Sequence, residues 1–288
     1  MQAPHTLTGK TRMAGILGWP VSHSRSPRLH GFWLARHGID GAYIPLPVEP
    51  AKFPGAVRAL ADLGFRGANV TIPHKEAALA ACDLVEDEAR RIGAVNTLVF
   101  REDGRIEGWN TDGWGFLESL REQAPGFHVK QGPAVILGAG GGARAVAHSL
   151  LSAGCPRMTL VNRSPARAEA LARELSAHGA HVDVTASPPL EDAALLVNTT
   201  SQGMQGQPPL TIDLAPLPPA AVVADIVYVP LETPLLAAAR ARGLAAVDGL
   251  GMLLHQGRRG FQAWYGKMPE VTAELRAFVA SDIPKQAG

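Results

Sequence analysis

The chain has 288 residues, about twice the usual domain size, so two compact domains or one large α/β unit are the first candidates. Its 27 basic and 26 acidic residues nearly cancel, which excludes a strong long-range field for nucleic acid or an anionic membrane. Only two cysteines are present, Cys82 and Cys155, and their wide separation argues against a disulfide framework and against a zinc or other metal site.

The partner that this composition favours is a small molecule, with no nucleic acid and no membrane. Residues 1–10 lack a basic stretch followed by an apolar run, and no later segment approaches the roughly 20 apolar residues of a membrane span. We therefore expect an unprocessed protein of the reducing cytoplasm. The oligomeric state is left open, with a homodimer as one candidate.

In the first part of the chain, β-rich runs alternate with stretches of helical period, which is typical of βαβ units around a mainly parallel sheet. The pattern predicts strands at 12–18, 42–47 and 67–72, and helices at 27–37, 53–63 and 75–81. A strand at 96–101 turns at Asp103-Gly104 into a partner strand at 106–109. This part is expected to form a sheet of its own.

A second α/β series begins after the Pro- and Gly-containing stretch 123–133. The pattern predicts strands at 134–138, 158–161, 195–198, 221–227 and 245–247, and helices at 143–153 and 165–178. The final stretch, 251–280, is mostly helical in period. The fold class is therefore α/β, with two sheets.

A glycine-rich loop joins the first strand and helix of this second series. The segment Gly138-Ala139-Gly140-Gly141-Gly142-Ala143 satisfies G-x-G-x-x-[G/A]. Such glycines let the backbone approach a pyrophosphate, and the free N–H groups and dipole of the following helix stabilise its negative charge. An ordinary flexible turn is the alternative, but the flanking strand and helix favour a dinucleotide site, with Gly138, Gly140 and Gly142 as the functional glycines.

The residues after the next strand favour NADP over NAD. An NAD site places Asp or Glu about 20 residues beyond the loop, whereas Asn162, Arg163 and Ser164 stand here. A carboxylate would repel a 2′-phosphate, while a guanidinium can hold it with paired hydrogen bonds and Ser164 can donate another. Arg167 can converge on the same phosphate, although a solvated helix face explains it equally well when it is taken alone.

Four polar clusters lie at predicted strand ends, at 22–27 (SHSRSP), 69–75 (NVTIPHK), 93–97 (GAVNT) and 110–113 (NTDG). Ser26 could simply be the N-cap of a helix that begins at Pro27. Asn69 and Thr71 alternate onto one side of a strand, and Lys75 follows just beyond its end. For any one cluster alone, a turn or cap is the simpler explanation.

Together with N-R-S-x-x-R-A at 162–168 and GLGMLLHQ at 249–256, these motifs resemble the shikimate dehydrogenase family in a fixed order from about residue 15 to 265. The resemblance implies a substrate-binding domain of residues 1–112 and 255–288 and an NADP-binding Rossmann domain of residues 113–254. C-terminal helices would return to the first domain, with the active site in a cleft between the two. The implied reaction is the NADP-dependent interconversion of shikimate and 3-dehydroshikimate in chorismate and aromatic amino-acid biosynthesis.

Position by position, the resemblance assigns three sets of residues. Lys75 and Asp112 match the catalytic pair, which also touches substrate. The other expected substrate contacts are a carboxylate clamp of Ser24 and Ser26, the polar ligands Asn69, Thr71, Asn96 and Gln256, and Tyr228 at the border of the substrate. Beyond the glycine loop, Asn162, Arg163, Ser164 and Arg167, the expected cofactor contacts are Thr200, Ile226, Gly249 and Met252, the last two near the nicotinamide.

The chemistry is consistent with this pair. Oxidising a secondary alcohol requires a base within hydrogen-bonding reach of the hydroxyl while hydride leaves the same carbon for the nicotinamide. A lysine can be that base where desolvation in a closed cleft favours its neutral form. Asp112 favours the protonated lysine instead, so we expect it to orient Lys75 and the reacting hydroxyl as part of a coupled pair.

The departures from the family pattern are few. Val229 stands where many relatives carry Asn and could alter the loop near Tyr228. Arg258-Arg259 stand where small residues are common, and they bring charge near Gln256, which leaves the substrate preference open. We assign no catalytic role to the histidines inside motifs, because a lone histidine is more often packed or solvated. These are His23, His74 and His255.

Three other functions share parts of the pattern. A quinate/shikimate dehydrogenase that accepts NAD is disfavoured by Arg163 in place of an acidic residue and by Ser26 in place of a bulkier threonine. A non-catalytic NADP-binding sensor should have lost Lys75 and Asp112, and both are present. Another cofactor-dependent reductase rests on fold analogy alone.

Overall fold

The computed structural model describes residues 7–177 and 179–283, and the chain divides into two compact units. Unit 1 comprises Met1–Thr111 and Gln256–Val279, and unit 2 comprises Asp112–His255 and Ala280–Gly288. Residues 1–6, part of the stretch expected to contain no targeting segment, lie outside the described residues. So does His178, the predicted end of a helix.

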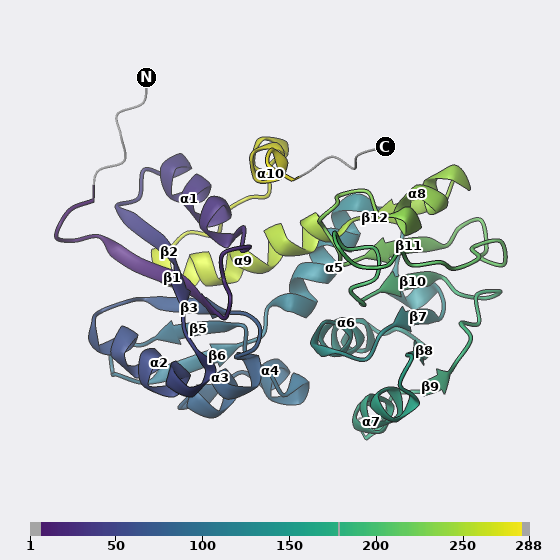
Figure 1. The fold of residues 1–288 in the computed structure, drawn as a ribbon, viewed down its shortest axis with the longest axis horizontal. Helices are drawn as coiled ribbons and strands as arrows, with labels where there is room; N and C mark the ends of the chain where they lie inside the picture. The colour runs from purple at the N-terminus through teal and green to yellow at the C-terminus, as the bar shows by residue number, and fades with distance from the viewer. Residues whose placement is uncertain (1–6, 178, 284–288) are drawn as a thin grey trace. The chain divides into compact units, whose positions relative to one another are not determined.

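Unit 1 contains a six-stranded sheet in the order β2-β1-β3-β5-β6-β4 (Figure 1). Its strands are β1 (Arg12–Gly18), β2 (Gly41–Pro47), β3 (Gly67–Val70), β4 (Leu84–Val85), β5 (Thr97–Phe100) and β6 (Ile106–Trp109). β1 is parallel to β2 and β3, and β4 is parallel to β6, whereas β5 is antiparallel to both of its neighbours. The prediction of a mainly parallel sheet is confirmed.

The pairing register brings the polar clusters of unit 1 to one edge of this sheet. Leu17 pairs with Val70, Asn69 pairs with Thr97, and Thr97 pairs with Trp109. The carboxyl ends of β1, β3 and β6 therefore meet the amino end of β5. The segments 19–26, 71–75, 93–96 and 110–111 all leave or enter the sheet at this edge.

Helices cover both faces of the first sheet. One face packs on α2 (Phe53–Asp62), which follows the exposed η1 (Pro50–Lys52), and on α3 (Lys75–Ala81) and α4 (Asp87–Ile92), with buried residues such as Phe53, Val57 and Leu98 in the shared core. The other carries α1 (Ser26–Arg36) and the part of α9 (Gly249–Tyr265) that belongs to unit 1, and α10 (Ala273–Ala280) lies against α1, where Phe278 and Phe32 have ring centroids 5.5 Å apart. Trp33 and Phe261 pack edge to face there, with ring centroids 5.3 Å apart.

The return of the C-terminal segment to unit 1 is fixed by hydrogen bonds from aromatic side chains. Trp264 donates its indole N–H to the carbonyl of Leu98 at 3.0 Å, and Tyr265 donates its hydroxyl to the carbonyl of Ala42 at 2.9 Å. Gly67 makes this approach possible, because a Cβ there would lie 2.2 Å from the Trp264 indole nitrogen.

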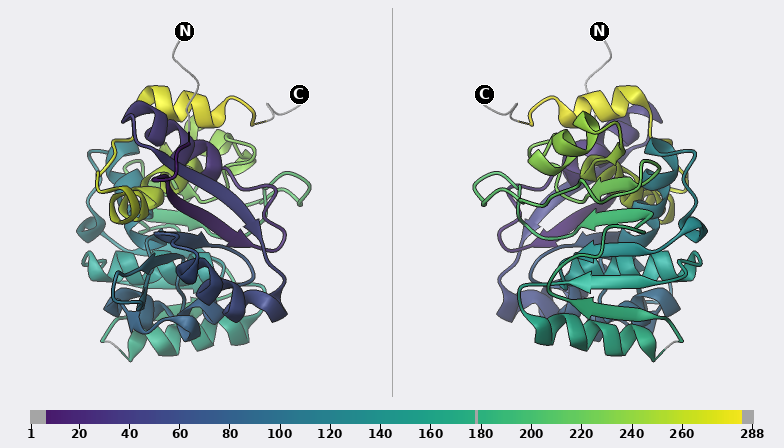
Figure 2. Two further views of the ribbon diagram at one scale, coloured as in Figure 1. Left: turned by 90° about the vertical axis from the view of Figure 1, so that its left-hand side faces the viewer. Right: turned by 90° about the vertical axis from the view of Figure 1, so that its right-hand side faces the viewer.

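Unit 2 contains a wholly parallel sheet in the order β12-β11-β10-β7-β8-β9 (Figure 2, right). Its strands are β7 (Ala134–Leu137), β8 (Met158–Val161), β9 (Val182–Thr185), β10 (Leu195–Asn198), β11 (Val222–Asp225) and β12 (Ala245–Val247). β8 and β9 extend from one side of β7, and β10 to β12 from the other. The order therefore reverses between β7 and β10, which is where doubly wound folds bind nucleotides.

Alternate residues of these strands face two different cores. Ala134 and Ile136 pack with α5 (Asp112–Gln123), α6 (Gly141–Ser152) and α7 (Pro165–Ser176), whereas Val135 and Leu137 pack with α8 (Pro234–Ala241). A short helix η2 (Val129–Gln131) precedes β7. Because both faces are covered, the central strands β7, β10 and β11 read as nearly continuous apolar runs, as is typical of parallel sheets.

Most predicted elements are present. The strands at 12–18, 106–109, 158–161, 195–198 and 245–247 and the helix at 75–81 have the predicted bounds. The strands predicted at 67–72 and 221–227 end earlier, at Val70 and Asp225, and the helix predicted from 143 begins at Gly141. The helices α4, α5 and α8 and the strands β4 and β9 are additional to the predicted set. Among the described residues, no helix combines the length and apolarity needed to cross a membrane.

Candidate active site

Asn69, near the end of β3, is the centre of a buried hydrogen-bond network in unit 1. Its Oδ1 accepts from the Tyr43 hydroxyl at 2.6 Å, and its Nδ2 donates to the Asn96 carbonyl at 3.2 Å and to Thr97 Oγ1 at 3.1 Å. The side chain is only 4% exposed. Because both amide hydrogens already have protein acceptors, the group that Asn69 can offer a ligand is a lone pair of its oxygen.

Asn96 extends the network from the segment before β5. Its Oδ1 accepts from the Thr111 backbone N–H at 2.9 Å, from the Thr111 hydroxyl at 3.2 Å and from the Thr97 hydroxyl at 2.9 Å. The backbone donor fixes which way the amide faces. Thr111 Oγ1 also lies 3.4 Å from Oε1 of Gln256, on the part of α9 that belongs to unit 1. The structure therefore brings together three of the predicted substrate ligands, Asn69, Asn96 and Gln256.

The two serines lie at the start of α1, but not as a simple cap. Ser26 is the first helical residue, Arg25 occupies the N-cap position without a side-chain cap, and Ser24 Oγ accepts from the Ser26 backbone N–H at 3.2 Å. The alternative that Ser26 is the N-cap is therefore wrong. Ser26 is 3% exposed and hydrogen bonds to Tyr43. Burial raises the pKa of Tyr43 well above its ordinary value, so the phenol stays neutral and donates to Asn69.

Lys75 begins α3, directly after the turn that follows β3. Its carbonyl accepts from the Val95 N–H at 2.9 Å, which ties the start of α3 to the segment that carries Asn96. Thr71 precedes this turn, donates its backbone N–H to Leu17 at 2.9 Å and is partly buried, as Lys75 is. The structure thus holds Lys75 and Thr71 at the same sheet edge as the network.

Asp112, the predicted partner of Lys75, is the first residue of α5 and of unit 2. It follows Thr111, a member of the buried network, directly in the chain. Because Lys75 and Asp112 belong to different units, their pairing stays a prediction. Tyr228 and the cofactor residues also belong to unit 2.

The motif histidines and the unusual arginines have contacts of their own. His74 lies 2.7 Å from the Val48 carbonyl and stacks on Phe53, and His255 lies 2.7 Å from Glu122, while His23 is exposed. Arg258 donates to the Pro269 carbonyl at 2.8 Å. Arg259 donates to Glu86 at 2.8 Å and lies over the Trp109 ring at 5.1 Å. Both charges of Arg258-Arg259 are thus engaged within unit 1.

In unit 2, the glycine-rich loop has the geometry that a pyrophosphate needs. Gly138 has φ +114, and a Cβ there would lie 2.5 Å from Thr199 Oγ1 across the boundary between β7 and β10. A Cβ on Gly142 would lie 2.8 Å from Ile226 Cδ1, whereas a Cβ on Gly140 or Gly141 would meet no atom within 4 Å. Gly140 is the N-cap of α6, with no side-chain cap. The space beside Gly140 and Gly141, at the N-terminus of α6, is therefore open, which suits the phosphates of a dinucleotide.

The residues that we assign to the 2′-phosphate follow β8. Arg163, Ser164 and Arg167 are exposed, and Asn162 Nδ2 donates to the Ser164 carbonyl at 2.9 Å, which shapes the turn into α7. Within residues 7–177 and 179–283, neither arginine forms an ion pair. Two cations next to a helix N-terminus are thus available to an anionic ligand.

The remaining cofactor residues follow β10, β11 and β12 at the same edge of the second sheet. Ala139, Ile226 and Met252 are partly buried and pack on the core that includes Ala143. Gly249, at the start of α9, lies so close to the chain after β11 that a Cβ would be 2.3 Å from the Ile226 carbonyl oxygen. Thr200 follows β10. The predicted cofactor contacts therefore gather at the carboxyl ends of the strands on both sides of β7.

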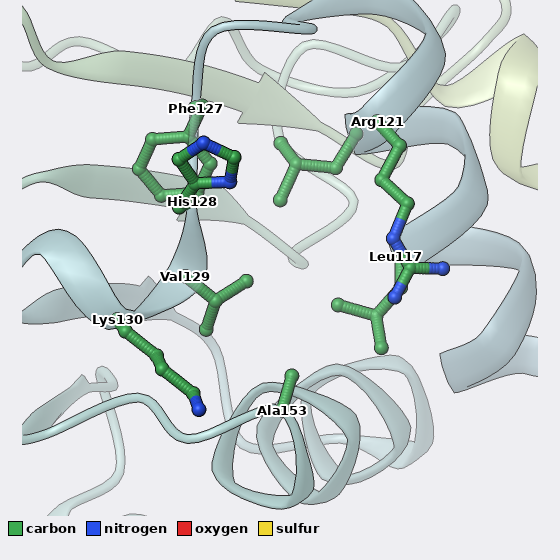
Figure 3. A pocket seen from close by; sticks show the side chains of 8 residues that line it. Leu117, Arg121, Phe127, His128, Val129, Lys130 and Ala153 are labelled. Atoms are coloured by element: carbon green, nitrogen blue, oxygen red, sulfur yellow. The ribbon is translucent and has the colours of Figure 1, made fainter.

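A separate cavity of about 210 Å³ lies elsewhere in unit 2, between α5, the segment 127–130 and the end of α6 (Figure 3). Leu117 and Val129 contribute apolar walls, and Arg121 and Lys130 contribute cations. None of its lining residues is a predicted site residue, so we do not place the active site there. Among the described residues, no group of three or more His, Cys, Asp or Glu side chains could hold a metal ion.

Fold and site together define a class of protein: a two-unit α/β oxidoreductase with a Rossmann-type nucleotide unit and a second unit that presents a buried polar network. The family model "Shikimate dehydrogenase substrate binding domain" matches residues 16–98, and "Shikimate / quinate 5-dehydrogenase" matches residues 119–215. The chain belongs to the shikimate dehydrogenase family.

Individual proteins agree with this membership. The "Shikimate dehydrogenase (NADP(+))" of Rhodospirillum rubrum is 63% identical, covering 95% of this chain and 98% of that protein. The structure of Thermus thermophilus shikimate 5-dehydrogenase with NADP(H) and shikimate has a TM-score of 0.82 and 40% identity, covering 95% of this chain and all of that one. Quinate dehydrogenase of Corynebacterium glutamicum with NAD has a TM-score of 0.85 and 32% identity, covering 94% and 99%.

Three members of the network were absent from the sequence-based set. They are Tyr43 in β2, Thr97 at the start of β5 and Thr111 before α5. Thr97 and Thr111 fall inside the GAVNT and NTDG motifs, which could have pointed to them. Tyr43 lies in an apolar strand with no motif around it, so its role depends on the tertiary structure.

Proposed function

We propose that this chain catalyses the reversible NADPH-dependent reduction of 3-dehydroshikimate to shikimate, a step of chorismate and aromatic amino-acid biosynthesis, in the cytoplasm. The observation that carries the proposal is the buried network that joins Asn69, Asn96 and Gln256 at one edge of the first sheet. Amide and hydroxyl groups held in fixed orientations are suited to the hydroxyls of a polyhydroxylated ring. The names of the relatives support the same substrate and cofactor.

We assign substrate binding to residues 1–112 and 255–288, and NADP binding to residues 113–254. Ser24 and Ser26 would hold the carboxylate, while Thr71, Asn69, Asn96, Gln256 and Tyr228 would face the ring. The glycine loop and α6 would hold the pyrophosphate, and Arg163, Ser164 and Arg167 the 2′-phosphate. Bound NADP supplies the hydride acceptor, or as NADPH the hydride donor, at the reacting carbon.

In this mechanism the protein's own groups manage the proton. Lys75 removes the proton of the reacting hydroxyl during oxidation and returns one to the oxygen during reduction. Asp112 orients Lys75 and the reacting hydroxyl. The hydroxyls of Ser24 and Ser26 fix the far end of the substrate and thereby the position of the reacting carbon.

The alternative within the family is a quinate/shikimate dehydrogenase that uses NAD, and initial rates distinguish the two. Shikimate and quinate are each assayed with NADP and with NAD. We expect the highest kcat/KM for shikimate with NADP, because two exposed arginines, rather than a carboxylate, follow β8. Quinate turnover with NAD at a similar rate would favour the alternative, and no reduction of either cofactor with shikimate would refute the proposal. A homodimer is one candidate assembly, and light scattering in solution decides it.

A further inference from the structure

Asn198 and Asp225 form a buried polar pair at the edge of the second sheet. They are the last residues of β10 and β11, are direct neighbours in the pairing register, and are 0% and 2% exposed. The loop 199–205 follows the first and carries Thr200. The loop 226–233 follows the second and carries Ile226 and Tyr228.

Asn198 uses its whole amide on the loop 199–205 and on Asp225. Its Oδ1 accepts from the backbone N–H of Thr200 at 3.0 Å and from the Thr200 hydroxyl at 2.7 Å. Its Nδ2 donates to the Gln202 carbonyl at 3.2 Å and to Asp225 Oδ1 at 2.9 Å. Asn198 therefore fixes the position of Thr200 and links it to Asp225 through hydrogen bonds of one amide group.

Asp225 holds the second loop at both of its ends. Oδ1 accepts from the Val227 N–H at 3.0 Å, and Oδ2 accepts from the Thr233 hydroxyl at 2.7 Å. Thr233 is also the N-cap of α8. The two loops meet again where the Gln205 N–H donates to the Val229 carbonyl at 2.8 Å.

A carboxyl group in this place is costly for folding. Burial raises the pKa of Asp225 to about 6, while hydrogen bonds from Thr233, Val227 and Asn198 oppose the shift. All three donors are neutral. Packing an apolar side chain between β10 and β11 would avoid the desolvation penalty but would leave the loops unlinked.

We propose that Asp225 is a positioning residue that couples the loops 199–205 and 226–233 through Asn198 and Thr233, so that the cofactor contacts Thr200 and Ile226 and the substrate contact Tyr228 are set together. This inference rests on the proposed function for the roles of those three contacts. The coupling itself rests on the hydrogen bonds of unit 2.

Asp225→Asn is the main test, because it keeps the size of the side chain but replaces one acceptor oxygen with an NH2 group. The side chain can then no longer accept both from the Thr233 hydroxyl and from the Asn198 amide and the Val227 N–H. At about pH 7.5 we expect NADPH, followed by its fluorescence, to bind about 10-fold more weakly. Backbone amide exchange should become faster in both loops. Because the amide resembles a protonated carboxyl, the difference in NADPH affinity should shrink as the pH falls from 7.5 to 5.

Thr233→Val and Thr233→Ser form a matched pair that serves even where Asp225→Asn does not fold. The valine removes the hydroxyl that Asp225 accepts, whereas the serine keeps it and should restore NADPH affinity. Since Thr233 also caps α8, Thr272→Val is the control. Thr272 accepts from the Leu275 N–H at 3.2 Å at the start of α10 in unit 1, so its loss should cost stability without weakening NADPH binding.

Equal NADPH affinity and equal amide exchange in Asp225→Asn and the wild type at pH 7.5 would overturn the proposal. If backbone amide exchange in Asp225→Asn became faster in the loop 226–233 alone, the coupling of the two loops would be overturned. A wild type that binds no NADPH would instead refute the proposed function. The exchange comparison would still decide the coupling in that case.

Discussion

Asn69 in unit 1 and Arg163 in unit 2 show two different ways to prepare a site. Asn69 is 4% exposed, and both of its amide hydrogens and its oxygen already have protein partners. Arg163 is exposed at the start of a turn and forms no ion pair with any described residue. The first group is held in position by the fold, whereas the second is held only at its backbone.

This difference predicts how tightly function and stability are linked in each unit. A change inside the network of unit 1 leaves a buried polar group unsatisfied, so substrate binding and stability should fall together. A change of an exposed cation in unit 2 leaves no buried group behind, so cofactor affinity should fall alone. The following variants test that contrast, beginning with the residue on which the reaction itself depends.

Lys75→Met should have the largest effect, because it removes the group that exchanges a proton with the reacting hydroxyl. We expect kcat to fall by roughly 10²- to 10⁴-fold with modest change in KM. For Asp112→Asn we expect a decrease in kcat within the same range. Steady-state kinetics with shikimate and NADP measure this, and Lys10→Met, an exposed lysine of unit 1, is the control. Unchanged turnover in both Lys75→Met and Asp112→Asn would refute their catalytic roles.

Arg163→Ala should have the next largest effect and should separate affinity from stability. Loss of a charge-assisted contact to the 2′-phosphate should raise the KM for NADP roughly 10- to 100-fold and leave the KM for NAD unchanged. The melting temperature should stay the same because the side chain is exposed. Arg173→Ala, an exposed arginine in the last turn of α7, the helix that follows Arg163, is the control. An equal rise in the KM for NAD would show that Arg163 does not bind the 2′-phosphate.

The strands and the glycine loop could be predicted from the sequence because local physics determines them. A continuous apolar run such as Ala134–Leu137 has few other stable solutions, and Gly138 stands where a side chain does not fit. The sequence does not predict α5, because Asn110-Thr-Asp-Gly is typical of a turn and the helix has two glycines in its first four residues. Phe116 and Leu120, buried in the core of unit 2, stabilise it despite that low local propensity.

The residues of the candidate site likewise divide into those that the sequence indicates and those that only the tertiary structure identifies. Asn69 and Asn96 stand out in the sequence because core packing does not explain an amide side chain at the end of a strand. Tyr43 does not stand out, because an aromatic residue in an apolar strand is ordinary. Its hydroxyl reaches Asn69 only because β1 lies between β2 and β3 in the sheet, an order that no local pattern specifies.

Gly138→Ala and Gly140→Ala should give different results within one loop. Gly140 has room for a Cβ, so the alanine should fold normally and weaken NADP binding on the order of 10-fold by crowding the pyrophosphate. Gly138 has φ +114 and a contact to Thr199, so the alanine should also cost about 1–3 kcal/mol of folding free energy. Fluorescence titration with NADPH and chemical denaturation measure the two effects. Gly126→Ala, with no atom near its Cβ, should change neither.

Tyr43→Phe should give the smallest change in activity and the strictest test of the network. Removing the donor to Asn69 should cost about 1–3 kcal/mol of folding free energy. Since the Asn69 oxygen then loses the bond that fixes it, the KM for shikimate should rise roughly 3- to 10-fold while the KM for NADP stays constant.

The matched control is Tyr265→Phe, a tyrosine of the same unit that is 2% exposed and donates to the Ala42 carbonyl rather than to a predicted ligand. It should lose a similar amount of stability with no change in either KM. If both variants raise the KM for shikimate equally, loss of stability alone explains the effect, and unit 1 does not orient its ligands through Tyr43. If only Tyr43→Phe does, the hydrogen bonds that stabilise the fold of unit 1 are the same ones that orient the substrate.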